Sequence, residues 1–101
     1  MTYAWEKFHL AIRTLAGPGT IHQRLAEAFT LHLLHVEPGE LPEEVRPLFL
    51  IVRDRLTRVA PVGDQSLAEA AVATLSEQEA LECIDQLMVM IDAVARREGN
   101  F

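Results

Sequence analysis

The apolar residues of this chain recur at helical spacing between three clusters of glycine and proline. The clusters lie at 17–19, 37–42 and 61–64, and glycine and proline there interrupt the helical pattern. No alternation of apolar and polar residues, as in a half-buried β-strand, continues for more than a few positions. The pattern therefore predicts an all-α fold, a compact bundle of four to five helices joined by short loops rich in glycine and proline.

Helix starts are marked by capping boxes, in which a hydroxyl accepts from the N3 amide and the N3 side chain reaches back to the cap amide. The three boxes pair Thr20 with Gln23, Ser66 with Glu69, and Ser76 with Glu79. We expect helices over 3–16, 21–36, 67–74 and 77–97. Gly17 is expected to end the first helix in the left-handed conformation.

Two prolines define the start of a third helix. Pro42 suits a first helical position, whereas Pro47 lacks an amide proton and disfavours helix at Arg46. We expect a short turn over 42–46, then a kink or restart, and then a helix that continues to Val59.

The expected core-facing stripes follow from the helical period. In the first two helices they are Trp5, Phe8, Ile12, Leu15 and Ala16, then Ile21, Leu25, Ala28, Phe29, His32 and Val36. In the last helix the stripe is Ala80, Ile84, Leu87, Ile91 and Val94, widened by Leu81, Met88, Cys83 and Met90.

The length and charge of the chain exclude several classes of protein to which it could belong. A chain of 101 residues makes one helical domain over 1–101, which excludes an enzyme with separate cofactor and substrate domains. Half of its residues are hydrophobic, which argues against intrinsic disorder. With 9 Lys+Arg against 15 Asp+Glu, the formal charge is −6, which disfavours binding to nucleic acid.

The expected location is cytoplasmic. Cys83 is the only cysteine, so no intramolecular disulfide forms and a reducing compartment is the simplest setting. The longest apolar runs, 48–52 and 87–91, have five residues each, whereas a membrane-spanning helix needs about 20. The first residues show no cationic region followed by an apolar stretch, so we expect no secretory signal and no membrane partner.

Signatures of catalysis are missing from the sequence. It contains no nucleophile elbow, phosphate-binding loop or dinucleotide fingerprint. Cys83 is expected beside the core, where apolar surroundings suppress thiol reactivity. Glu6 and His9 have the Glu-x-x-His spacing of di-iron bundles, but such sites need the motif from two helices and it occurs once. We interpret the chain as a protein that is not an enzyme and has no cofactor.

One pair of histidines leaves a second possibility open. His32 and His35 are neighbours on a helix at i, i+3, and imidazole suits zinc, copper or iron. A metal site needs three or four ligands, and no third candidate has a spacing that compels it. The simpler interpretation is a core histidine hydrogen-bonded to a carbonyl or carboxylate. The alternative function is therefore a bundle that binds a metal or small ligand near these two residues.

Charged residues form two clusters. Four glutamates, at 37, 40, 43 and 44, surround the second loop, and Arg53, Arg55 and Arg58 gather at the end of the third helix. They are either a solvated surface with cations at a helix C-terminus or a charged docking edge between two subunits.

Some apolar residues do not fit on one core-facing stripe per helix, and they lead to the main expectation about function. Leu50, Ile51, Val89 and Met90 lie partly off the expected stripes, and Leu31 and Leu34 lie on the outer side of the second helix. Exposed apolar patches usually mark an interface, and a two-fold homodimer is the commonest closed arrangement. The expected function is association, as a homodimer or with an unidentified protein partner. The interface would consist of Leu50, Ile51, Val89 and Met90, with Leu31 and Leu34 as a second candidate surface.

Five segments carry a further pattern: QRLAEA at 23–28, LLH at 33–35, LPEEVR at 41–46, RLT at 55–57 and SEQEA at 76–80. In these segments the chain resembles a group of short uncharacterised bacterial all-helical proteins. Pro47 departs from the pattern of that group, which bears on the continuity of the third helix. The resemblance implies an all-helical fold, and because no activity is assigned to the group, it implies no function.

Overall fold

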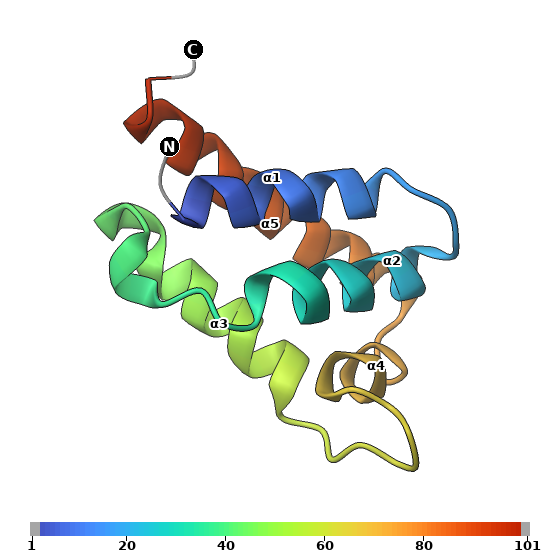
Figure 1. Ribbon diagram of the computed structural model, residues 1–101. Helices are drawn as coiled ribbons and strands as arrows, with labels where there is room; N and C mark the ends of the chain where they lie inside the picture. The colour runs from blue at the N-terminus through green and yellow to red at the C-terminus, as the bar shows by residue number, and fades with distance from the viewer. Residues whose placement is uncertain (1–2, 100–101) are drawn as a thin grey trace.

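Residues 3–99, which the computed structural model describes, form five α-helices and contain no β-strand (Figure 1). The α-helices are α1 (Tyr3–Leu15), α2 (Ile21–Ala28), α3 (Arg46–Thr57), α4 (Leu67–Val72) and α5 (Glu77–Arg97). A π-helix, η1 (Phe29–Leu33), continues α2, and two 3-10 helices, η2 (Pro38–Glu40) and η3 (Glu43–Val45), precede α3. The predicted all-α bundle is confirmed.

The helices pack around α5, which contacts α1, α2 and α3. α1 and α2 form a helical hairpin, and α5 lies behind α1 in Figure 1. The short α4 packs against α2 and α3 at the end of the bundle where α5 begins (Figure 1). Each helix therefore buries one face and leaves the opposite face to solvent.

Three phenylalanines and one face of α5 make up the centre of the core. Phe8 of α1, Phe29 of η1 and Phe49 of α3 are almost completely buried. α5 contributes a stripe of five buried residues, namely Ala80, Cys83, Leu87, Met90 and Val94. α4 contributes small residues, which allow it to approach its neighbours closely: Ala68, Ala70, Ala71 and Val72.

The predicted helix starts are confirmed, whereas the end of α1 differs from expectation. All three capping boxes are present, and the Glu37 amide also donates to Glu40 Oε1 at 2.8 Å. Gly17 does not have a positive φ, because its N–H donates to Thr14 O at 3.1 Å and closes the helix with a tighter turn. Gly19 takes the left-handed region instead, with φ 107°, and Ala16 is exposed.

The restart predicted at Pro47 is also confirmed. The 3-10 helix η3 precedes α3, and Pro47 lies in the first turn of α3, where a missing amide breaks no helical hydrogen bond. The guanidinium of Arg46 donates from Nε to Leu41 O at 3.0 Å, which fastens the preceding loop to the start of α3.

The second helix is the main departure from the expected elements. One α-helix was expected over 21–36, but the α-helix ends at Ala28 and the Leu34 N–H donates to Phe29 O, five residues back, at 2.9 Å. A π-turn holds more residues than an α-turn and therefore shifts the helical register. Leu33 takes a fully buried position, and His32 lies half-buried at the side facing α1.

No helix within residues 3–99 has the length and apolar character needed to cross a lipid bilayer.

Candidate functional site

Four of the six residues expected at an interface are exposed. Leu31, Leu50, Ile51 and Val89 are 62%, 43%, 58% and 56% exposed, respectively. Leu34 is half-buried and packs against the core.

Met90 is completely buried, which corrects its assignment to the expected interface. The buried face of α5 runs through Cys83, Met90 and Val94, whereas Ile84 and Ile91 are half-buried at its edge. The face is rotated from the expected stripe because α5 packs against α3 as well as α1. Contacts between distant helices, rather than the period of one helix, decide this rotation.

α3 and α5 run in opposite directions. Arg55 of α3 donates to Glu79 of α5 at 3.3 Å, which joins the last turn of α3 to the first turn of α5. α5 also contacts η3, the segment immediately before α3. The C-terminal end of α3 therefore lies beside the N-terminal end of α5, and the other two ends lie together.

Exposed apolar and charged residues have the same spacing on the two helices. Ile51 of α3 and Arg58, the residue that caps the end of α3, are seven residues apart and therefore lie on one side of the helix. On α5, Glu82 and Val89 have the same separation, and all four side chains are exposed. We call these four residues, with Leu50 at the edge, the α3–α5 face. Its charged residues lie toward one end and its apolar residues toward the other.

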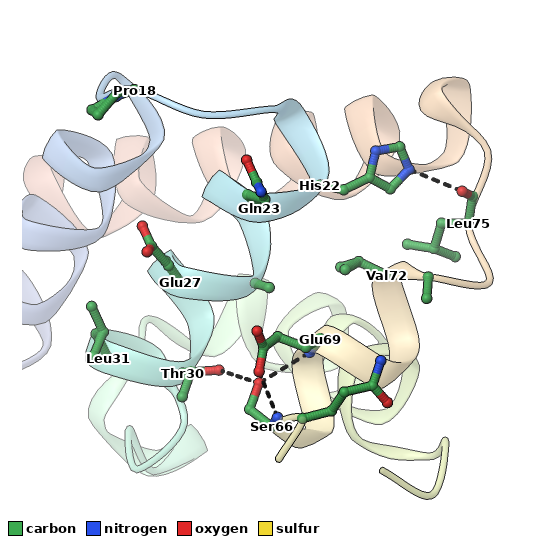
Figure 2. A pocket seen from close by; sticks show the side chains of 13 residues that line it. Pro18, His22, Gln23, Glu27, Thr30, Leu31, Ser66, Glu69, Val72 and Leu75 are labelled. Atoms are coloured by element: carbon green, nitrogen blue, oxygen red, sulfur yellow. Dashed lines mark hydrogen bonds between the residues drawn. The ribbon is translucent and has the colours of Figure 1, made fainter. Parts of the chain in front are cut away.

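A groove of about 780 Å³ lies between α2 and α4 (Figure 2). One wall comes from α2 and η1, and the other from α4 and its flanking residues. The lining residues are Pro18, His22, Gln23, Ala26, Glu27, Thr30 and Leu31 on the first side and Gln65, Ser66, Glu69, Val72, Ala73 and Leu75 on the second. Leu31, a candidate interface residue, is thus part of the groove.

Hydrogen bonds tie the two walls together at two places. The His22 ring donates from Nε2 to Leu75 O at 2.9 Å, since a carbonyl oxygen only accepts. Thr30 Oγ1 donates to Ser66 Oγ at 3.3 Å, and Ser66 Oγ also accepts from the Glu69 N–H at 3.0 Å (Figure 2). These hydrogen bonds fix the position of one wall relative to the other.

The two candidate metal ligands have different surroundings. His32 Nε2 lies 3.1 Å from Thr14 Oγ1, whereas His35, which follows the π-helix, is exposed. Burial, and to a smaller extent the positive charge of Lys7, lowers the pKa of His32 below 6.5. Within residues 3–99, no three His, Cys, Asp or Glu side chains gather so that they could hold a metal ion. The interpretation of His32 as a hydrogen-bonded histidine is supported, with a hydroxyl rather than a carbonyl or carboxylate as its partner.

His9 and Cys83, the other two residues considered for chemistry, are each packed against or inside the protein. The His9 ring lies against Trp5, with ring centroids 4.7 Å apart. Cys83 is completely buried, and this burial raises the pKa of its thiol, so the nucleophilic thiolate is disfavoured.

The groove is the feature that sequence reasoning missed. Its walls come from residues 18–31 and 65–75, and no periodic pattern in either segment shows that they face each other. The one available signal is the run of small residues in α4, because such residues let a neighbouring helix approach closely, but they do not identify that neighbour.

Comparison of this chain with protein-family models, curated proteins and solved structures gives no match.

Proposed function

We propose that the protein acts without catalysis, by associating as a two-fold homodimer through the α3–α5 face. The observation that carries the proposal is the exposure of Ile51 and Val89, at 58% and 56%, on adjacent antiparallel helices. A contiguous exposed apolar patch usually marks a protein interface, and the proposal takes these two residues as parts of one patch.

The order of residues on this face suits a second copy of the same chain. Consider a two-fold axis that runs between α3 and α5, parallel to both. It places α3 of one copy over α5 of the other. Because a rotation about this axis does not move residues along it, the charged ends of the two copies lie together and so do the apolar ends. Arg58 would then approach Glu82 of the second copy, and Ile51 would approach its Val89. An isologous interface repeats both pairs.

Apolar contact and charge have different roles in this arrangement. Each copy carries a formal charge of −6, so long-range repulsion opposes association and the apolar residues must provide the attraction. Arg58 is paired with Asp54 within the chain at 3.5 Å, in an exposed contact of small energy. If Arg58 leaves Asp54 and pairs with Glu82 of the second copy, the new pair therefore determines the orientation of the dimer more than the affinity of the two copies.

Sedimentation velocity over a range of protein concentrations tests the proposal. The wild-type chain is expected to shift from monomer to dimer as concentration rises. Ile51→Asp and Val89→Asp are expected to weaken the dimer at least tenfold, because each buries a charge against an apolar partner. The matched control is Leu31→Asp, which places the same charge at an exposed leucine outside this face and should leave the dimer intact.

A charge exchange tests the orientation of the two copies. Arg58→Glu and Glu82→Arg should each weaken the dimer, and the double variant should recover most of the loss. A wild-type chain that remains monomeric at high micromolar concentration contradicts the homodimer. A dimer that Leu31→Asp disrupts and Ile51→Asp does not would assign the interface to the second candidate surface instead.

A further inference from the structure

We propose that the groove between α2 and α4 binds a small organic cation, an amine attached to an apolar body. This site is separate from the α3–α5 face, and the inference does not depend on the homodimer.

The size of the groove fits a small molecule. Its volume of about 780 Å³ lies within the usual range for small-ligand sites, about 300–1,000 Å³. The bonds from His22 to Leu75 and from Thr30 to Ser66 join the walls, so the space does not have to be opened by the ligand. A preformed site loses less free energy to ordering when it binds.

The charge of the lining residues favours a cationic ligand. Glu27 on the α2 side and Glu69 on the α4 side are carboxylates, and none of the lining residues is lysine or arginine. An anionic ligand would meet repulsion from both walls, and a neutral ligand could gain a hydrogen bond from a carboxylate but no attraction between opposite charges. The net charge of −6 for the chain acts in the same direction.

Glu69 is held in place by its capping role. Its Oε1 accepts from the Ser66 N–H at 2.7 Å, which fixes the carboxylate at the start of α4. Its other oxygen points into the space between α2 and α4 (Figure 2). This oxygen accepts no hydrogen bond from residues 3–99, so an ammonium group in the groove can donate to it.

The apolar residues of the groove suit the body of such a ligand. Ala26 and Val72 are buried at its base, Leu75 is half-buried, and Leu31 and Ala73 are exposed beside it. They offer apolar contact to an alkyl chain or an aromatic ring. Six apolar lining residues together with two carboxylates, and no lysine or arginine, distinguish this groove from a solvated acidic surface.

Three probes with similar bodies test the inference: phenethylammonium, 2-phenylethanol and 3-phenylpropanoate. Binding is followed by changes in the amide NMR signals of residues 22–31 and 65–75 during titration. We expect phenethylammonium to shift these signals and to bind at least tenfold more tightly than the alcohol, with the carboxylate weakest. No binding of the ammonium at about 10 mM, or equal affinity for ammonium and alcohol, would overturn the inference.

Variants locate the site. Glu27→Gln and Glu69→Gln should each weaken binding of the ammonium about fivefold, the effect of losing one exposed charge pair. Glutamine preserves the capping box at Ser66, so Glu69→Gln should retain the fold. Glu44→Gln makes the same change of net charge at an exposed position outside the groove and should leave affinity unchanged. An equal loss in all three variants would show a general charge effect and overturn the site.

Filling the groove gives an independent test. Ala73 is exposed on the groove wall, so Ala73→Trp should block the space with little effect on stability and abolish binding. Ile51→Asp, on the α3–α5 face, should bind phenethylammonium as wild type does. Full affinity in Ala73→Trp would overturn the inference, whatever the oligomeric state of the protein.

Discussion

His32 of η1 is held against α1 by a hydrogen bond of 3.1 Å between its Nε2 and Thr14 Oγ1. The Thr14 hydroxyl donates to Leu10 O at 3.2 Å, so its oxygen is left to accept from the His32 Nε2–H. The neutral ring therefore carries its proton on Nε2, and acid would add the second proton at Nδ1. Burial of the ring, and secondarily the charge of Lys7, opposes this protonation and lowers the pKa of His32.

The lowered pKa of His32 predicts a loss of stability in mild acid. The unfolded chain binds a proton at this histidine near pH 6.5, whereas the folded chain binds it only at lower pH. Stability is therefore complete above 6.5 and falls as the pH decreases toward the folded pKa. His32→Gln retains a donor for Thr14 but cannot titrate, so its unfolding free energy should fall less between about pH 6.5 and 5. Urea denaturation across this range measures the difference.

Direct titration of His32 by NMR provides the control for this prediction. Lys7→Gln should raise the pKa of His32, because it removes the second cause of the shift. His35→Gln, at an exposed histidine, should leave the pKa of His32 and the acid dependence of stability unchanged. A pKa of His32 at or above 6.5 would contradict the argument.

Local signals predicted most of the fold. Each capping box involves residues three apart, so the starts of α2, α4 and α5 could be predicted from short segments alone. The restart at Pro47 is likewise a property of one residue and its neighbours. The π-turn in η1 has no such signature, because it depends on how Phe29 and Leu33 fit the core rather than on a cap or a turn residue.

The candidate sites were less accessible to sequence reasoning. Exposure of Leu50, Ile51 and Val89 was predicted, because the length of an apolar run exceeds what one helix face can bury. Met90 was expected both at the edge of the core-facing stripe and at the interface, and the choice between the two depends on the angle at which α5 packs against α3. The groove between α2 and α4 depends on two segments that are distant in the sequence.

Neighbouring residues on α5 should respond differently to truncation. Met90 is completely buried, so Met90→Ala should lower the unfolding free energy by about 2–5 kcal/mol. Val89→Ala, at a residue 56% exposed, should change the stability of the monomer by less than about 0.5 kcal/mol. Both are measured by urea denaturation at low protein concentration, where association does not contribute. A small loss for Met90→Ala would show that this side chain lies outside the core in solution.

The capping box of α5 should contribute measurably to stability. Ser76 Oγ accepts from the Glu79 N–H at 3.1 Å, and Ser76→Ala leaves that amide without its acceptor, at a cost of about 1 kcal/mol. Ser76→Asp retains an acceptor and should keep most of the stability. The second bond of the box, from the Ser76 amide to Glu79 Oε1 at 2.8 Å, is the largest cause of the lowered pKa of Glu79, so it is this second bond that weakens as the pH falls through that pKa. Equal losses in both variants, measured by thermal denaturation at neutral pH, would contradict the capping argument.

Gln86 of α5 offers a site where replacement of a polar side chain should stabilise the protein. Its Oε1 is buried and accepts no hydrogen bond from residues 3–99. A buried acceptor without a donor costs about 1–3 kcal/mol in lost hydration, and methionine has a similar shape without the amide. Gln86→Met should therefore raise the unfolding free energy by about 1 kcal/mol. Gln78→Met, at an exposed glutamine of the same helix, should have little effect. A Gln86→Met protein no more stable than wild type would show that water donates to Oε1 in solution.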